Sequence, residues 1–199
     1  MLLQSTALRK VRKLCSAWEK ILLLYVWIYL QCFDTYVCSI LLYGGEIWGI
    51  HKAPMVEKVQ LDYLKMLLGV KRYTANVMIY YELGRVPLCC ERNFRKLKFW
   101  FKIHASDNCI LKSCYRELVL KCTKCTNWAT YVRNILCGLG RNYLWENQWL
   151  LNTDFSILSI IRQRLLDQTK QELNSLLESS NKCILYKYIV SNIHLQFYS

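Results

Sequence analysis

The chain has 199 residues, of which 54% are hydrophobic and 14% aromatic, so it can bury a substantial core and is not expected to be disordered. Its 27 Lys and Arg against 14 Asp and Glu give a formal net charge of +13, which favours polyanionic partners such as nucleic acid or an anionic membrane surface. Eleven cysteines, an odd number without an evident export signal, argue against a secreted disulfide scaffold and for reduced thiols in an intracellular protein, cytoplasmic or nuclear.

Residue types that interrupt helices are rare in this chain. Only two prolines and seven glycines occur, whereas a sandwich of many strands needs a turn signal every 8–12 residues. We therefore predict an all-α fold. An irregular, thumb-like helical bundle is expected over residues 1–104, followed by a helical connection region over residues 105–199.

An apolar run near the N-terminus, "ILLLYVWIYL" at residues 21–30, follows four basic residues within positions 9–13. A basic flank before an apolar run is typical of a signal anchor. The run is shorter than the roughly 20 residues that a spanning helix needs, and Gln31 and Asp34 interrupt it. We predict a helix buried in a helical core. The alternative is a small membrane-associated protein anchored by residues 21–43.

The first half of the chain predicts a succession of helices with short joints. They are expected over residues 5–32, over residues 34–47 with Asp34 as the N-cap, from Pro54, from Thr74 to Gly84, and from Pro87. After Pro54, apolar residues recur at helical spacing at Val56, Val59, Tyr63, Met66 and Leu67. Each proline is therefore expected at the start of a helix.

The second half has a weaker pattern up to residue 128, which we interpret as two shorter helices, and then a loop at Gly138 and Gly140. Asp154 is expected to cap the clearest helix of the chain. Its apolar side comprises Ile157, Ile161, Leu165, Leu166, Leu173 and Leu176. The tail after residue 180 is rich in β-branched and aromatic residues, so it suits either a helix or a short strand pair.

The stretch "LLYGGEIWG" at residues 41–49 combines two glycines with a tryptophan and one acid, as an active-site loop or a packed corner would. It lacks the Gly-Lys-Ser/Thr ending of a phosphate-binding loop. We interpret it as packing, in which Leu41, Ile47 and Trp48 are buried and the glycines let another helix approach. Glu46 is expected to pair with a nearby Arg or Lys.

Catalytic chemistry has little support in the sequence. Two-metal phosphoryl or nucleotidyl transfer needs closely spaced carboxylates, but the five aspartates are isolated from one another. His51 and His194 have no nucleophile or acid at a suggestive spacing, and His104 follows an apolar helical face as a core histidine would. We predict no catalytic residue, no cofactor and no small-molecule substrate.

A zinc site can be drawn from the CxxC pair Cys122 and Cys125 with the upstream Cys109, Cys114 and His104. The upstream spacing is irregular and thiols are abundant throughout the chain. Reduced, partly buried cysteines are therefore the preferred interpretation, and no metal is predicted.

The helix expected from Pro87 gives the best functional signal. We predict that five cations form one broad arc, Arg92, Arg95, Lys96, Lys98 and Lys102, and that Phe94, Leu97, Trp100 and Phe101 form the opposite one. Such a row can follow a phosphate backbone by releasing counterions, independently of base sequence. On this interpretation, charge reversal of Arg95 and Lys96 weakens binding similarly across sequences. The alternative is a solvated helix face without a ligand.

Three stretches are distinctive: "VCSILLYGGEIWG" at residues 37–49, "VEKVQLDYLKMLLGVKRYT" at residues 56–74 and "YYELGRVPL" at residues 80–88. They resemble the region that follows the catalytic palm in non-LTR (LINE-type) retrotransposon reverse transcriptases. Further on, "RQRLLDQTKQELNSLLESSNKCILYKYI" at residues 162–189 is similar to a distal segment of the same polyproteins. Residues 105–150 contribute little to the resemblance.

The resemblance implies a fragment that covers the helical thumb and the connection after it. In that family the polymerase chemistry belongs to an aromatic-x-Asp-Asp motif and a further aspartate, and this sequence contains no Asp-Asp pair. A thumb holds primer-template by its backbone, so RNA or an RNA–DNA duplex is the expected partner. A relic open reading frame without function is a further alternative.

Overall fold

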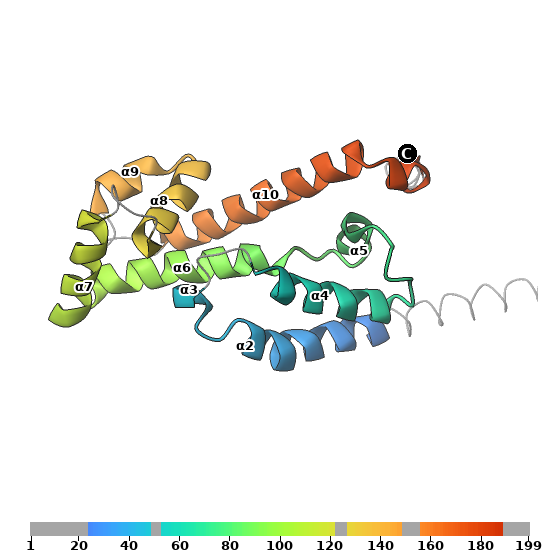
Figure 1. Ribbon diagram of the computed structural model, residues 1–199, viewed down its shortest axis with the longest axis horizontal. Helices are drawn as coiled ribbons and strands as arrows, with labels where there is room; N and C mark the ends of the chain where they lie inside the picture. Colours follow the sequence, from blue (N-terminus) through green and yellow to red (C-terminus); the bar gives the residue numbers. More distant parts are fainter. Residues whose placement is uncertain (1–23, 49–52, 122–126, 149–155, 189–199) are drawn as a thin grey trace, which may run out of the picture. The chain divides into compact units, whose positions relative to one another are not determined.

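The computed structural model describes residues 24–48, 53–121, 127–148 and 156–188, and every regular element among them is helical (Figure 1). The predicted all-α fold is confirmed. The chain separates into two compact units, residues 1–43 and residues 44–199, which are described in turn.

The described part of the first unit is one helical run. Residues 24–32 continue into the π-helix η1 (Phe33–Val37) and then into α2 (Cys38–Leu41). The N–H of Cys38 donates to the carbonyl of Phe33, five residues back. Asp34 therefore lies inside the run and does not cap a second helix. The predicted division at residue 34 is wrong, because a π turn adds one residue to a helix without ending it. The part of the predicted helix before residue 24 lies outside the described residues.

The second unit begins with a sharp turn. Gly44 has φ +64°, in the left-handed region that glycine adopts at least cost, and α3 (Gly45–Trp48) follows it. The single helix predicted over residues 34–47 is therefore interrupted at Gly44. The prediction that Ile47 and Trp48 are buried is wrong, because 60% of Ile47 and 43% of Trp48 are exposed.

The bounds of the next helices lie within a residue or two of the predicted positions. Pro54 begins α4 (Pro54–Leu67), as predicted. Ala75, not Thr74, precedes α5 (Asn76–Glu82), and Gly84 with φ +59° ends that segment. Pro87 is the N-cap of α6 (Leu88–Ala105).

The buried face of α4 differs from the predicted stripe. Gln60, Leu64 and Lys65 are buried, whereas Val59 and Met66 are exposed. The amide of Gln60 explains its place inside: its Nε2 donates to the carbonyl of Val86 at 3.1 Å, and its Oε1 accepts from the Tyr80 hydroxyl at 3.3 Å. A buried polar side chain with both ends bonded costs little, so periodicity of apolar residues alone misreads such a helix.

The described part of the second unit continues with α7 (Cys109–Leu120), α8 (Trp128–Gly138), α9 (Asn142–Glu146) and α10 (Ser156–Ser179) (Figure 1). Asn127 and Thr130 form a capping box at the start of α8. The predicted cap Asp154 lies outside the described residues. Leu176, predicted on the apolar side of α10, is 58% exposed, and Leu177 is buried instead. Residues 181–188 are helical, beginning with η3 (Asn181–Cys183), so no strand pair forms within them.

The main core surrounds α6. It contains side chains from α6, α7, α8, α9 and α10, among them the fully buried Trp100, Leu136 and Ile161. The indole of Trp100 donates to the Tyr115 hydroxyl at 2.8 Å, which in turn donates to Oε1 of Gln148 at 3.1 Å. This core joins side chains on both sides of the predicted domain boundary after residue 104.

One carboxylate joins α4 to the start of α6. Oε2 of Glu57 accepts from the backbone N–H of Leu88 at 2.8 Å, and its Oε1 lies 3.1 Å from Nη2 of Arg92. The first N–H groups of a helix have no partner within the helix, and its positive end favours an anion. Glu57 therefore supplies from a distant helix the N-terminal cap that α6 lacks locally, since Pro87 makes no side-chain cap.

We expect Glu57→Ala to lower the free energy of unfolding by about 3 kcal/mol, because it removes the cap and leaves the guanidinium of Arg92 buried without its carboxylate. Urea denaturation followed by circular dichroism measures the loss. Glu117→Ala is the matched control: the Glu117–Lys121 pair is exposed on both sides, so its loss is expected to cost less than about 1 kcal/mol. Equal effects of the two substitutions would contradict the role given to Glu57.

Candidate nucleic-acid interface

The five cations predicted to form one arc on α6 divide between two faces. Arg92 is 4% exposed and Lys96 is 3% exposed, whereas Lys98 and Lys102 are exposed and Arg95 is partly so. Helical geometry explains the division, since positions 92 and 96 are one turn apart, while positions 95, 98 and 102 follow the i, i+3, i+7 pattern of a different face. The prediction of a single five-residue cationic face is therefore wrong.

Arg92 and Lys96 are structural residues. Arg92 pairs with Glu57, as described above. Nζ of Lys96 donates to Oδ1 of Asn93 at 3.2 Å and lies 6.0 Å from the centroid of the Tyr131 ring. Burial lowers the pKa of Lys96 to about 8, and the positive charge of Arg92 acts in the same direction. Charge reversal of Lys96 would therefore test folding and not binding.

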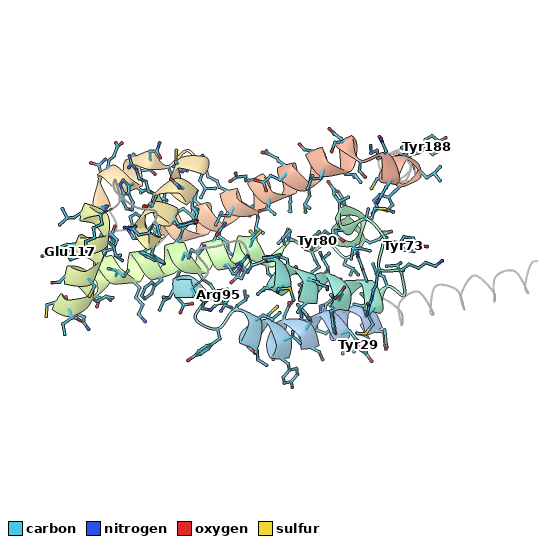
Figure 2. The ribbon with its side chains drawn as sticks, viewed as in Figure 1. Tyr29, Tyr73, Tyr80, Arg95, Glu117 and Tyr188 are labelled. Atoms are coloured by element: carbon cyan, nitrogen blue, oxygen red, sulfur yellow. The ribbon has the colours of Figure 1, made fainter. Side chains whose placement is uncertain are left out.

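A groove of about 570 Å³ contains the remaining three cations. Figure 2 labels Arg95 on α6, close to α3. The floor of the groove is the outer face of α6, and its walls include Glu46 of α3 and Leu158 of α10. Its lining residues are Glu46, Glu91, Phe94, Arg95, Lys98, Phe99, Lys102, Ala105 and Leu158. The groove thus combines a cationic row with aromatic and aliphatic sides.

Two carboxylates moderate the charge of the groove. Oε1 of Glu91 lies 3.4 Å from Nε of Arg95, and its Oε2 lies 3.8 Å from Nη2 of Arg162, so two guanidinium groups share its charge. Glu46 also lines the groove, and the predicted ion pair between it and an Arg or Lys is not formed with any described residue. With Arg162 at the edge, cations outnumber carboxylates around the groove.

The wall formed by α3 is held in place by two contacts. The indole N–H of Trp128 donates to the backbone carbonyl of Glu46 at 2.6 Å. Gly45 also packs against α6, where a Cβ added to the glycine would be in ordinary van der Waals contact, 3.8 Å from Cγ of Arg92. The approach of α3 to α6 therefore does not require a glycine at position 45, so the role predicted for the glycine pair finds no support here; Gly44 instead provides the turn with positive φ.

The opposite wall is ordered by a cation–π contact. The guanidinium carbon of Arg162 on α10 lies 5.2 Å from the centroid of the Phe94 ring. Phe99, towards the other side, meets the Trp128 ring edge-on, with centroids 5.8 Å apart and planes at 82°. Both phenyl rings are half-buried, so each has a fixed neighbour and a remaining accessible surface.

The sequence did not indicate that Glu46, Phe99 and Leu158 belong to the same site as the α6 cations. Phe99 falls inside the predicted cationic arc of the helical wheel, between Arg95 and Arg92, and the other two residues come from helices distant in the chain. The charge row at 95, 98 and 102 was the available signal. Its spacing did not exclude Arg92, which precedes Arg95 by the same three residues that separate Arg95 from Lys98.

The other predicted candidates do not form a site within the described residues. His104 contacts the rings of Trp100 and Tyr115, and burial, followed by the charge of Lys112, lowers its pKa. Cys109 and Cys114 are exposed free thiols. Cys122, Cys125, His51 and His194 lie outside the described residues. Among those described, no three His, Cys, Asp or Glu side chains converge in a way that could hold a metal ion.

A second hollow, of about 820 Å³, lies beside Glu57 between α4 and α6. It includes Lys65, but Nζ of Lys65 already donates to the carbonyl of Arg72 at 2.7 Å, and Arg92 is held by Glu57. Asp62 also lines it. The two most buried cations of this hollow are thus committed to the fold, which makes the α6 groove the better candidate for an anion.

Comparison of the chain with protein-family models, with curated proteins and with solved structures found no match.

We expect Lys96→Met to stabilise the protein at pH 7 and to do so less as the pH rises. The folded state binds the Lys96 proton more weakly than the unfolded chain does, because its pKa is about 8 against the ordinary lysine pKa of 10.5. The cost of burying this charge is thus full below pH 8 and lost by about pH 10.5. Urea denaturation of both proteins between pH 7 and 10 measures the converging curves. Lys98→Met, at an exposed position, is the control; parallel curves for Lys96→Met would exclude a buried charge.

Proposed function

We propose that this chain binds the backbone of RNA or of an RNA–DNA duplex without sequence specificity, as a non-catalytic, thumb-like region related to non-LTR retrotransposon reverse transcriptases. The observation that carries the proposal is the convergence of Arg95, Lys98 and Lys102 in one groove. Cations at this spacing interact with successive phosphates and gain free energy from counterion release. The formal net charge of +13 adds long-range attraction for any polyanion.

Two further observations support the same proposal. The residues at 37–49, 56–74 and 80–88 resemble the segments after the palm in those polymerases, and the motif at 37–49 contains the α3 wall of the groove. The second is chemical: Lys98 and Lys102 form no salt bridge with the described residues, so their charge is not neutralised within the part of the chain that is seen. We assign no polymerase chemistry to the chain.

A fluorescence-anisotropy titration with a primer-template duplex, at several salt concentrations, tests the proposal. We expect Lys98→Gln/Lys102→Gln to weaken binding more than tenfold at low salt and to reduce the slope of log K against log salt by about 2, because two phosphate contacts are lost. The effect is expected to be similar for different base sequences.

The matched control is Arg116→Gln/Arg133→Gln, which removes the same charge from exposed positions of α7 and α8 that do not line the groove. This control is expected to change the affinity less than twofold to threefold. If both double variants lose affinity equally, the net charge and not the groove is responsible. If the folded protein binds neither the duplex nor a single-stranded RNA, the proposal fails.

Membrane association is the second candidate function, and one observation favours it. The helical run Leu24–Leu41 is long and apolar enough to cross a membrane, by length and composition. Its large hydrophobic side chains include the exposed Trp27, Tyr36 and Ile40. If this run is a membrane anchor, the basic second unit is attracted to the anionic lipid headgroups.

Extraction of membranes from expressing cells with alkaline carbonate tests this candidate. An integral anchor is expected to keep the protein in the pellet, and Ile28→Lys/Ile40→Lys to release it, because charges in a spanning segment are costly. Met55→Lys/Met66→Lys, which adds the same charge at exposed positions of α4, is the control. Release of the unaltered protein by carbonate would exclude the anchor.

A further inference from the structure

The α6 groove has more apolar than charged surface along its sides, which a ligand that offers only phosphates would not use. Phe94, Phe99, Ala105 and Leu158 line it together with the cations. In a duplex the bases are stacked inside and the protein meets phosphate and sugar, whereas an unpaired strand also presents the flat faces of its bases. The mixed lining therefore matches a single strand better than a duplex.

We infer that the groove takes single-stranded nucleic acid in preference to duplex, with bases against Phe94 and Phe99 and phosphates along Lys98 and Lys102. This inference rests on the proposed function and specifies its ligand. It comes from the juxtaposition of two aromatic rings and a cationic row on the same helix face and its flanks.

Both rings are already ordered, which lowers the entropic cost of stacking. Phe94 lies beneath the guanidinium of Arg162, and Phe99 is fixed by the edge of Trp128. Arg162 itself is 59% exposed, and its planar guanidinium is a second surface on which a base can stack. An aromatic side chain and an arginine plane in contact form a platform that tolerates every base, so no sequence preference is expected.

The length of the groove sets the size of its ligand. Glu91 and Ala105 mark the ends of its floor, and 14 residue steps of an α-helix span about 21 Å. A segment of a few unpaired nucleotides fits within that length. An acidic peptide would satisfy the cations as well, but it would leave the phenyl rings without partners, so we argue for the nucleic acid.

The test compares four fluorescent probes in anisotropy titrations of the full chain at low salt: a short single-stranded RNA, an abasic sugar–phosphate oligomer of the same charge, a duplex of the same length, and an oligoglutamate peptide. We expect the single strand to bind at least tenfold more tightly than the other three. Stacking is the difference between the first two probes, since their phosphates are the same.

Phe94→Leu and Phe99→Leu locate the stacking, because leucine keeps the apolar contact and removes the ring. Each is expected to weaken binding of the single strand by about fivefold to a hundredfold, leaving the abasic oligomer and the salt slope unchanged. Tyr73→Leu, at an exposed aromatic residue outside the groove, is the control. Near-ultraviolet circular dichroism verifies that the variants are folded.

The outcomes separate the inference from the function on which it rests. If the duplex or the abasic oligomer binds as tightly as the single strand, and the lysine variants still weaken it, the single-strand inference is overturned and backbone binding stands. If the oligoglutamate peptide binds as tightly as RNA, or if no nucleic acid binds, both are overturned.

Discussion

The arrangement of the second unit depends on the carboxylate of Glu57. It accepts the N–H of Leu88 and pairs with Arg92, so one side chain of α4 both caps and neutralises the start of α6. Removing a charged group from water costs free energy unless an opposite charge is close by, and Glu57 and Arg92 provide that charge for each other. Because α6 forms the centre of the main core and the floor of the groove, a change in the conformation of its first turn would displace both the core and the groove.

The two faces of α6 have opposite uses, and their separation follows from helical geometry. Arg92 and Lys96 are turned inward, where burial lowers the pKa of the lysine and ion pairing holds the arginine. Arg95, Lys98 and Lys102 are turned towards the groove. A helix of this kind is basic in composition throughout, yet only part of its charge is available to a ligand. Counting cations along a sequence therefore overstates the charge that a surface presents.

The limits of sequence reasoning are visible at particular residues. Pro54 and Pro87 marked the starts of helices, and Gly84 an end, because proline and glycine act through local backbone geometry. The burial of Arg92 depends on a carboxylate 35 positions away, which no local periodicity reveals. The sequence did not predict the groove either, since its walls at Glu46 and Leu158 come together only through tertiary packing. Local rules thus predicted the helix starts at Pro54 and Pro87 but not the continuous run through Asp34 or the break at Gly44, and long-range contacts determined the site.

The hydrogen bond from Trp128 to the carbonyl of Glu46 joins positions 82 residues apart. Chains are made from the N-terminus, and contacts distant in sequence wait for the later partner. Glu46 and the whole of α6 leave the ribosome before the tryptophan that fixes α3 and well before Leu158. During synthesis the groove therefore lacks its α10 wall, and the hydrogen bond that holds its α3 wall, until after α6 is complete. The order of synthesis thus makes the groove one of the last features of the second unit to form.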